Sequence, residues 1–511
     1  MITCFKKFCL PLVVFLTGAC VLIIEVVAIR ILSPYYGNTL FTVSSVISII
    51  LAALSVGYYW GGRLADQYPT EKVFYSIILI SGFSIILLYL LRLFLLPVIG
   101  YRLSITAGPL IIALLLFFLP SLLLGTLSPF AIKLQTQYFP EKGIGSITGK
   151  IFFWSTVGSI FGSLLAGFVL IPQFEINEIV IAVAVMLIAL GACPLIKKNA
   201  YQKINFNIIL FSIVGLFFVI VLAQVKNNHV VYSRDGVYEK ITIYDGQYAE
   251  KSTRFLLLDR SASAAMFLDS DELVFDYTKY NVLYKVFKPE VKRILVIGGG
   301  AYSIPKTLLK ALPNATIDVS EIEPSLYPLA QRYFNVKKTE RLNNYTIDGR
   351  RFLHDTDKKY DFIVGDAYYS LYSIPAHLTT QDFLKLVRDK LTPDGLFIAN
   401  LIGDLSPQKP SLILSEIKTF QSVFPNSYFF AVHNPHSIDV QNIIFVGYNS
   451  DKKIDFTNSK IINHNDPIIR SLKEKMIRLD QFNFSQYPIL TDNFSPVEYL
   501  TSRMLQRNVI D

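Results

Sequence analysis

The most constraining feature of this sequence is its first half, where apolar residues follow one another almost without interruption from residue 8 to residue 224. A helix needs about 20 mainly apolar residues to cross a bilayer. Charged residues make up only 17% of the chain, against roughly 25% in soluble domains, and they return at ordinary density only after residue 226. We therefore predict a multi-span α-helical membrane domain followed by a soluble half.

Seven stretches of the first half are long and apolar enough to be spans. They cover residues 8–32, 40–59, 73–96, 105–130, 147–171, 176–196 and 206–223. The fourth contains two prolines, so a broken helix or a re-entrant pair stays open there. Glu25, deep in an apolar stretch, is either a functional residue or a structural acid paired with Arg30. Gly57 and Gly61 begin a segment that resembles the loop after the second helix of major facilitator transporters, or they allow close helix packing.

The charge distribution bears on topology and partners. Lys and Arg favour the cytoplasmic ends of spans, which predicts a cytoplasmic N-terminus and, after seven crossings, a soluble half outside. The nucleoside chemistry predicted below favours the cytoplasmic side instead, so the side stays open. We expect an integral protein of a bacterial inner (cell) membrane, in contact with the lipid bilayer. The net charge of +9 forms no basic stripe interleaved with aromatics, so no nucleic acid is expected.

The pattern changes after residue 230 to short alternating runs at residues 230–233, 240–244 and 254–258. Asp235-Gly236 and Asp245-Gly246 separate these runs and are typical of turns between strands. We predict three domains: a transmembrane domain of about seven spans over residues 1–226, a small antiparallel β domain over 227–288 and an α/β domain over 289–511.

The α/β domain begins with a buried strand at residues 293–297 that continues directly into Gly298, Gly299 and Gly300. A helix is predicted at residues 303–312. A strand, a glycine turn and a helix N-terminus together form a cradle for a phosphate or a nucleoside. The next strand, at residues 316–320, ends in Glu321, at the spacing where a carboxylate binds ribose hydroxyls.

Two further strands also end in acids. Asp348 and Gly349 follow a short strand at residues 345–347, and Asp366 follows a strand at residues 360–364. Because the carboxyl ends of parallel strands meet at one sheet edge, these acids, Glu321 and the glycine turn are predicted to line one site. Any one acid could instead cap a strand or helix. A helix at residues 380–391, a turn at 392–395 and a strand at 396–401 complete the predicted elements.

These motifs resemble a known family. RILVIGGG (293–300), DVSEIEP (318–324), DFIVGDAY (361–368), IPAHLTTQDF (374–383) and LTPDG (391–395) are similar to polyamine aminopropyltransferases, the spermidine synthases. LTDNFSPVEYL (490–500), behind a hydrophobic half, resembles the membrane-fused spermidine-synthase-like type. The resemblance implies a small β domain, then a methyltransferase-like doubly wound (Rossmann-like) sheet. It also implies transfer of an aminopropyl group from decarboxylated S-adenosylmethionine to a small-molecule amine acceptor.

The resemblance also implies roles for the residues that match the family motifs. Gly298–Gly300 would hold the nucleoside, Glu321 the ribose, and Asp348 with Gly349 the adenine amino group. Asp366 stands where the family has its catalytic aspartate, which orients and deprotonates the attacking amine. The six histidines show no metal-ligand spacing, so we expect no metal. A homodimer stays open.

Three departures from the family leave alternatives open. Ala301, Tyr302 and Ser303 follow the glycines where the family continues Asp-Gly-Gly, Tyr369 replaces a diamine-binding Asp, and Phe275-Asp276-Tyr277 replaces Tyr-Gln/His-Glu. Aromatic faces could hold a cation instead, or simply pack. The candidates are Tyr302, Tyr368, Tyr369 and Tyr372, of which Tyr368 and Tyr369 are the predicted substrate-binding residues. The alternatives are a methyltransferase using ordinary S-adenosylmethionine and a transporter or scaffold that binds a nucleoside without catalysis.

Overall fold

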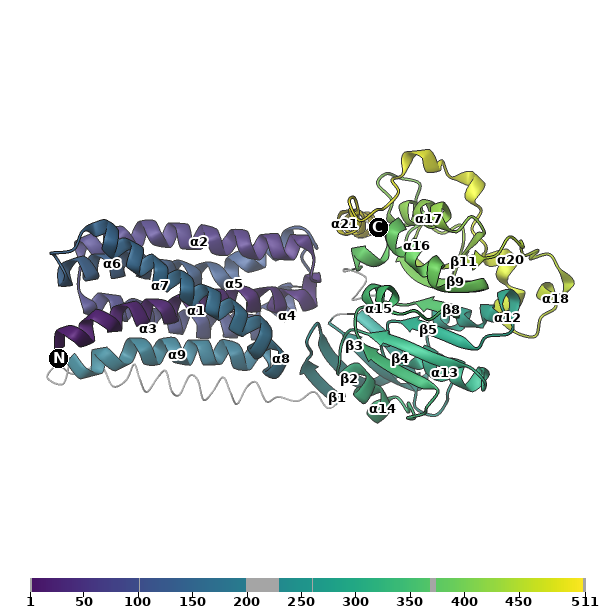
Figure 1. The fold of residues 1–511 in the computed structure, drawn as a ribbon, viewed down its shortest axis with the longest axis horizontal. Coiled ribbons are helices and arrows are strands. Elements are labelled where there is room, and N and C mark those ends of the chain that lie inside the picture. The colour runs from purple at the N-terminus through teal and green to yellow at the C-terminus, as the bar shows by residue number, and fades with distance from the viewer. Residues whose placement is uncertain (1, 101, 199–228, 260, 368–373, 509–511) are drawn as a thin grey trace. The chain divides into compact units, whose positions relative to one another are not determined.

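A computed structural model describes residues 2–100, 102–198, 229–259, 261–367 and 374–508 (Figure 1). The chain divides into two compact units, Met1–Asn227 and Asn228–Asp511. We call the first the helical unit and the second the C-terminal unit.

The first unit is a bundle of helices (Figure 1). Its elements are α1 (Ile2–Tyr36), α2 (Leu40–Gln67), α3 (Glu71–Phe94), α4 (Leu96–Ile99), α5 (Ala107–Gly125), α6 (Leu127–Tyr138), α7 (Ile144–Leu165), the π-helix η1 (Ala166–Leu170), α8 (Ile171–Gln173) and α9 (Ile176–Lys198). Among the described residues, five helical stretches are long and apolar enough to cross a membrane: Leu10–Tyr36, Leu40–Gln67, Glu71–Phe94, Ala107–Tyr138 and Ile144–Gln173. The sixth predicted span coincides with α9, whose apolar part, Ile176–Ala192, is shorter. The seventh, residues 206–223, lies outside the described residues.

In this unit the structure distinguishes between the alternatives left open at two places. α5 and α6 meet at Thr126 and both pack along α2, so the fourth stretch is one interrupted passage and not a re-entrant pair. Gly57 and Gly61 lie inside α2 and not in a transporter-type loop. A Cβ atom at Gly57 would lie 2.3 Å from the Leu122 carbonyl oxygen of α5. The close approach of α2 to α5 therefore explains this glycine, as the packing interpretation predicts.

The C-terminal unit begins with the predicted antiparallel sheet, which has four strands in the order β1 (Val230–Asp235), β2 (Lys240–Tyr248), β3 (Lys251–Leu258) and β4 (Ser261–Phe267). β4 escaped prediction because its Ser-Ala repeat has weak strand propensity. The turn predicted at Asp245-Gly246 is wrong. Asp245 lies within β2 and accepts hydrogen bonds from Arg254 of β3 at 2.7 and 2.8 Å. The chain reverses instead at Ala249 and Glu250, both with positive φ.

A seven-stranded sheet follows, and it is Rossmann-like, as predicted. Its strands are β5 (Arg293–Ile297), β6 (Thr316–Glu321), β7 (Leu342–Thr346), β8 (Tyr360–Gly365), β9 (Leu391–Gly403), β10 (Ser427–Ala431) and β11 (Gln441–Asn449). They lie in the order β10-β11-β9-β8-β5-β6-β7, with β5 to β9 parallel and β10 and β11 antiparallel. The strand order reverses between β5 and β8, the place where open α/β sheets bind ligands. Residues 392–395, predicted as a turn, lie within β9.

Helices cover both faces of this sheet. Successive side chains of β5 point to opposite faces, so they pack in two different clusters. Ile294 and Val296 pack on the side of α13 (Ser303–Ala311). Leu295 and Ile297 pack on the side of α15 (Gly349–Asp355), α16 (Gln381–Lys390) and α17 (Leu412–Val423).

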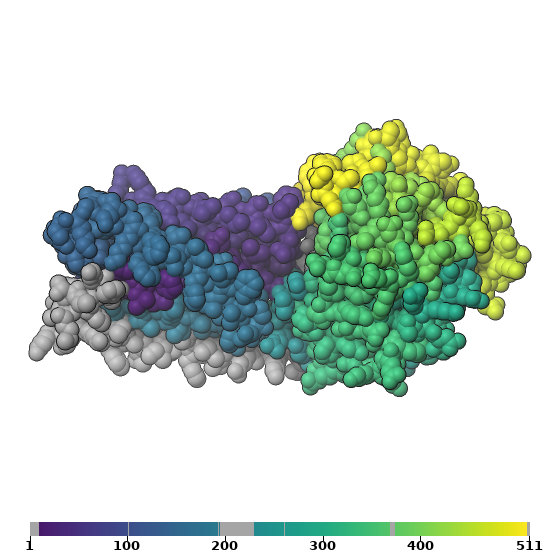
Figure 2. Space-filling view, in the orientation of Figure 1, coloured from purple at the N-terminus to yellow at the C-terminus, as the bar shows by residue number. Residues whose placement is uncertain are grey.

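The remaining elements are α11 (Asp276–Lys279), η2 (Tyr280–Leu283), α12 (Tyr284–Phe287), α14 (Leu326–Tyr333), η3 (Ala376–Leu378), α18 (Ser459–Ile462), α19 (Pro467–Arg470), α20 (Leu472–Lys475), η4 (Leu479–Gln481), η5 (Phe484–Gln486) and α21 (Val497–Asn508). Figure 2 shows described residues near the C-terminus, in yellow, on the surface of this unit.

Candidate active site

A cavity of about 530 Å³ lies at the carboxyl ends of β5, β6 and β8. Its walls also include residues of β4, β9 and the segment before α11. Every predicted cofactor-binding and catalytic residue lines it: Gly298, Gly299, Gly300, Glu321, Asp348, Gly349 and Asp366. Tyr368 and Tyr369, predicted to bind substrate, lie outside the described residues, as does Tyr372.

The glycine turn brings two strand ends into contact. Gly298 has φ +92°, and a Cβ atom there would lie 2.3 Å from the carbonyl oxygen of Asp366. Only glycine combines this conformation with this close approach. The Asp366 N–H also donates to the carbonyl of Ile297, at 2.9 Å. The end of β8 is therefore fixed against the glycine turn.

Glu321, at the end of β6, is buried against the same turn. Its Oε2 accepts the N–H groups of Gly299 at 2.7 Å and Gly300 at 3.2 Å, and its Oε1 accepts the N–H of Glu323 at 2.8 Å. Burial raises the pKa of Glu321, while these backbone bonds oppose the rise. A carboxylate offers about four acceptor positions, so one more donor, such as a hydroxyl, can still bind. Because the carboxylate occupies the N–H groups of the turn, they do not form a phosphate cradle.

Asp348 lies just beyond β7 and caps the N-terminus of α15. Its Oδ1 accepts the N–H of Arg351, and its Oδ2 lies 2.9 Å from Nε2 of His377. Burial favours the neutral acid, but the bonds from His377 and Arg351 outweigh it and hold the pKa of Asp348 below its usual range. The carboxylate is therefore ionised at neutral pH.

Asp366, directly after β8, has weaker partners. Its Oδ1 accepts Nδ2 of Asn400 at 3.2 Å, and its Oδ2 accepts the hydroxyl of Tyr277 at 3.3 Å. Burial raises the pKa of Asp366 to about 6, although both hydrogen bonds act in the opposite direction. An acid with this pKa is mostly ionised at pH 7 yet close enough to neutrality to take up a proton, as a general base must.

The charge of the cavity is one-sided. Five carboxylates line it, and no Lys or Arg is among the described residues of its wall. The acids are Glu239, Asp276, Glu321, Asp348 and Asp366. Carboxylates brought together in a partly buried site favour a positively charged ligand and disfavour an anionic one.

Of the two alternatives open for Tyr302, a cation site and simple packing, the structure supports packing. The Tyr302 side chain is fully buried, and it is not part of the cavity wall. Its hydroxyl donates to Oδ1 of Asn344, and its ring packs on Tyr327 with the centroids 5.0 Å apart. Tyr302 therefore packs in the core and does not offer its aromatic face to a cation.

Three residues of the site escaped prediction: Tyr277, His377 and Asn400. Asn400 lies on β9 near the same sheet edge as the acids, so the rule applied to the other strand ends would have found it. His377 lies in a motif that we used only for the family resemblance. Tyr277 follows the antiparallel sheet, and no local pattern connects it with Asp366. Among the described residues, no three His, Cys, Asp or Glu side chains gather as metal ligands.

The chain is similar to several known proteins. It is 24% identical over 284 residues to a polyamine aminopropyltransferase of Vibrio vulnificus, covering 54% of this chain and 93% of that protein. It is 23% identical over 450 residues to polyamine aminopropyltransferase 2 of Aquifex aeolicus, covering 83% of this chain and 85% of that protein. The second match is longer than the C-terminal unit, so it extends into the helical unit. A probable spermidine synthase of Corynebacterium glutamicum is a structural neighbour, with 19% identity, a TM-score of 0.39, and coverage of 48% of this chain and 95% of that chain.

A family comparison covers the core of the C-terminal unit. Residues 282–458 match the family described as the spermine/spermidine synthase domain. The match includes the glycine turn, Glu321, Asp348 and Asp366, and it lies entirely within the C-terminal unit.

Proposed function

We propose that this protein transfers an aminopropyl group from decarboxylated S-adenosylmethionine to an amine acceptor. The observation that supports this most is the cavity wall, which has five carboxylates and no Lys or Arg among its described residues. Decarboxylated S-adenosylmethionine carries a sulfonium and an ammonium and no anionic group. Ordinary S-adenosylmethionine carries a carboxylate as well, which would find no cationic partner in the described part of this wall.

The nucleoside is proposed to bind at the glycine turn. Glu321 accepts a hydrogen bond from a ribose hydroxyl, and Asp348 accepts one from the adenine amino group. Both carboxylates are held by backbone N–H groups, so their positions do not depend on a ligand. A site prepared in this way loses little conformational entropy when the nucleoside binds.

Asp366 is proposed to act on the acceptor amine, which is protonated in solution. The carboxylate attracts the ammonium and accepts one of its protons, which frees the nitrogen lone pair. The nitrogen attacks the aminopropyl carbon bound to sulfur, a C–N bond forms and the C–S bond breaks. The sulfonium keeps the bonding pair and leaves as a neutral thioether, 5′-methylthioadenosine. Tyr277 and Asn400 each hold one oxygen of the Asp366 carboxylate in place.

The proposal is tested by incubating the purified full chain with each donor and a panel of amines and identifying the products by mass spectrometry. We expect an aminopropylated amine and an equal amount of 5′-methylthioadenosine from the decarboxylated donor. Methyl transfer from ordinary S-adenosylmethionine, with no reaction of the decarboxylated donor, would overturn the proposal.

One observation favours a second candidate, a methyltransferase. Ala301 stands where the family has an aspartate that recognises the aminopropyl ammonium, and Ala301 is buried. The aminopropyl group therefore lacks one anionic anchor at this turn. The product analysis above separates the two candidates, because a methyl group and an aminopropyl group differ in mass.

We further propose that the helical unit is an integral part of a bacterial inner membrane and that the C-terminal unit is cytoplasmic. Five apolar helices of sufficient length support membrane insertion. The side is tested by fusing reporters after Asp511, one active only in the cytoplasm and one active only outside it. Activity of the outside reporter alone would contradict the cytoplasmic side.

A further inference from the structure

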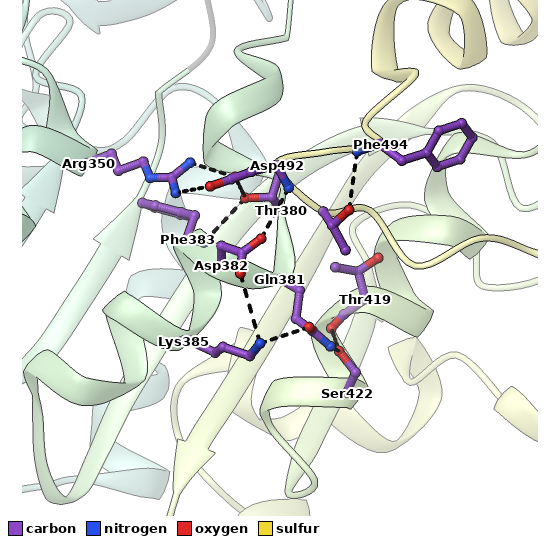
Figure 3. A network of polar contacts seen from close by, with 11 residues as sticks. Arg350, Thr380, Gln381, Asp382, Phe383, Lys385, Thr419, Ser422, Asp492 and Phe494 are labelled. Carbon is purple, nitrogen blue, oxygen red and sulfur yellow. Dashed lines mark hydrogen bonds and ion pairs between the residues drawn. The ribbon is translucent and has the colours of Figure 1, made fainter.

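The carboxylate of Asp492, in the C-terminal segment, pairs with Arg350 of α15 (Figure 3). Asp492 follows β11 by more than forty residues, yet it receives a bidentate pair of hydrogen bonds from Arg350 at the start of α15. Nη1 of Arg350 lies 2.8 Å from Oδ1 of Asp492, and Nη2 lies 2.5 Å from Oδ2. Charge-assisted pairs of this kind fix orientation as well as distance.

The same pair holds the short segment that contains His377. Arg350 Nη1 also donates to the carbonyl oxygen of His377 at 3.2 Å. The hydroxyl of Thr380 donates to Oδ1 of Asp492 at 2.8 Å, and Thr380 is the N-cap residue of α16. The turn η3 and the beginning of α16 are therefore both tied to Asp492.

The His377 ring extends this network to the nucleoside end of the cavity. Its Nε2 lies 2.9 Å from Oδ2 of Asp348, and both residues line the cavity. The other oxygen of Asp348 accepts the N–H of Arg351, the residue next to Arg350. Asp492 thus reaches Asp348 through Arg350 and His377, although it is not itself part of the cavity wall.

We infer that Asp492 is a positioning residue for the nucleoside. Through Arg350 it fixes the backbone of His377, the His377 ring then fixes the Asp348 carboxylate, and the position of that carboxylate determines the affinity for the nucleoside. The inference rests on the proposed function only in taking the ligand to be an adenine nucleoside. It does not depend on which group is transferred.

The competing explanation is that Asp492 only holds the C-terminal segment in place. Other contacts of this segment allow the two explanations to be distinguished. The N–H of Gln381 donates to the carbonyl of Leu490 at 2.8 Å, and the N–H of Asp492 donates to Asp382 at 3.1 Å. These backbone contacts hold the C-terminal segment independently of the Asp492 side chain. Asp492→Asn should therefore keep the segment in place while weakening the pair with Arg350.

The test is the Kd of the full chain for 5′-methylthioadenosine. We expect Asp492→Asn to weaken binding by about 5- to 20-fold, because the pair is charge-assisted but partly exposed. The kcat at saturating donor should stay within about twofold, since no contact at Asp366 changes. Asp355→Asn is the matched control: Asp355 is also on α15, pairs with Arg351 at 2.5 Å and lies outside the cavity wall. Its Kd should equal that of the parent.

A double-mutant cycle tests the route through His377. In a His377→Ala background, Asp492→Asn should change the Kd by less than about twofold, because the connection to Asp348 is already broken. An equal loss in both backgrounds, or a parental Kd for Asp492→Asn, would overturn the inference. If Asp492→Asn lowers the melting temperature, Arg350→Lys replaces it, since lysine keeps the charge but not the bidentate geometry. Nucleoside binding with this pattern but without aminopropyl transfer would contradict the proposed function alone.

Discussion

The two ends of the cavity are built differently. At the end proposed to bind the nucleoside, here the nucleoside end, Glu321 accepts three backbone N–H groups, at 2.7 to 3.2 Å, and Asp348 accepts a fourth. At the proposed reacting end, the hydrogen-bond donors to Asp366 among the described residues are the neutral side chains of Asn400 and Tyr277, at 3.2 and 3.3 Å. The fold sets the positions of backbone N–H donors. The side-chain donors Asn400 of β9 and Tyr277 of α11 can instead be changed by substitution. The nucleoside end is therefore fixed by the fold, and the reacting end is open to specialisation.

The largest effect is expected at the reacting end. Asp366→Asn keeps the shape of the side chain but removes the proton acceptor, so kcat should fall by roughly 10²- to 10⁴-fold. The Kd for the nucleoside should not change, because Glu321 and Asp348 are untouched. Steady-state kinetics and titration calorimetry on the same preparation measure both quantities. A kcat within a few-fold of the parent would show that Asp366 merely caps the following turn, because asparagine is as good a cap as aspartate.

At the nucleoside end we expect a substitution to change the Kd for the nucleoside more than it changes kcat. Glu321→Ala should weaken nucleoside binding by on the order of 30- to 150-fold, the equivalent of losing a charge-assisted hydrogen bond worth about 2 to 3 kcal/mol. Titration with 5′-methylthioadenosine measures it, and the exposed Glu340→Ala serves as a control. Unchanged affinity would mean that Glu321 only satisfies the N–H groups of the turn.

A third buried acid shows what burial does when no described residue is a hydrogen-bond partner. Glu416 on α17 is buried, neither of its carboxylate oxygens has a hydrogen-bond partner among the residues that the structure describes, and burial raises its pKa to about 8. In the unfolded chain it ionises near pH 4.3. The stability that the neutral acid contributes is therefore complete below about pH 4 and is lost as the pH rises to 8, by up to about 1.4 kcal/mol per pH unit. Glu416→Gln should remove this slope.

Calorimetric melting of the full chain at pH 5 and at pH 8 measures that slope. The parent should lose more stability than Glu416→Gln between the two pH values. Equal losses in both proteins would show that Glu416 is already ionised in the folded state.

The smallest effect concerns the pH profile. The Tyr277 hydroxyl lowers the pKa of Asp366, so Tyr277→Phe should raise that pKa above its value of about 6. Because the base must be ionised, kcat/KM falls as the pH drops through this pKa, and the midpoint should move upward by less than about one pH unit. At pH 8 the variant should be within a few-fold of the parent. A midpoint that stays in place or moves down would separate Tyr277 from the titration of Asp366.

The positions of site residues could be predicted from the sequence where they follow from the local pattern of strands. Glu321, Asp348 and Asp366 could be located because parallel strands bring their carboxyl ends to one edge. Tyr277 and His377 could not, because their proximity to these acids depends on how separate loops pack. Glu416 escaped notice because a glutamate within a helix is ordinarily exposed to solvent. The turn at Asp245-Gly246 was wrong because Arg254, nine residues away, holds Asp245 inside a strand.

The one-sided charge of the cavity has a consequence for turnover. With the proposed donor, the nucleoside enters as a cation and leaves as an uncharged thioether, because transfer removes the sulfonium. The carboxylates therefore attract the donor more strongly than they retain the spent nucleoside. Each catalytic cycle weakens the electrostatic hold on its own nucleoside product, which favours exchange of that product for a fresh donor.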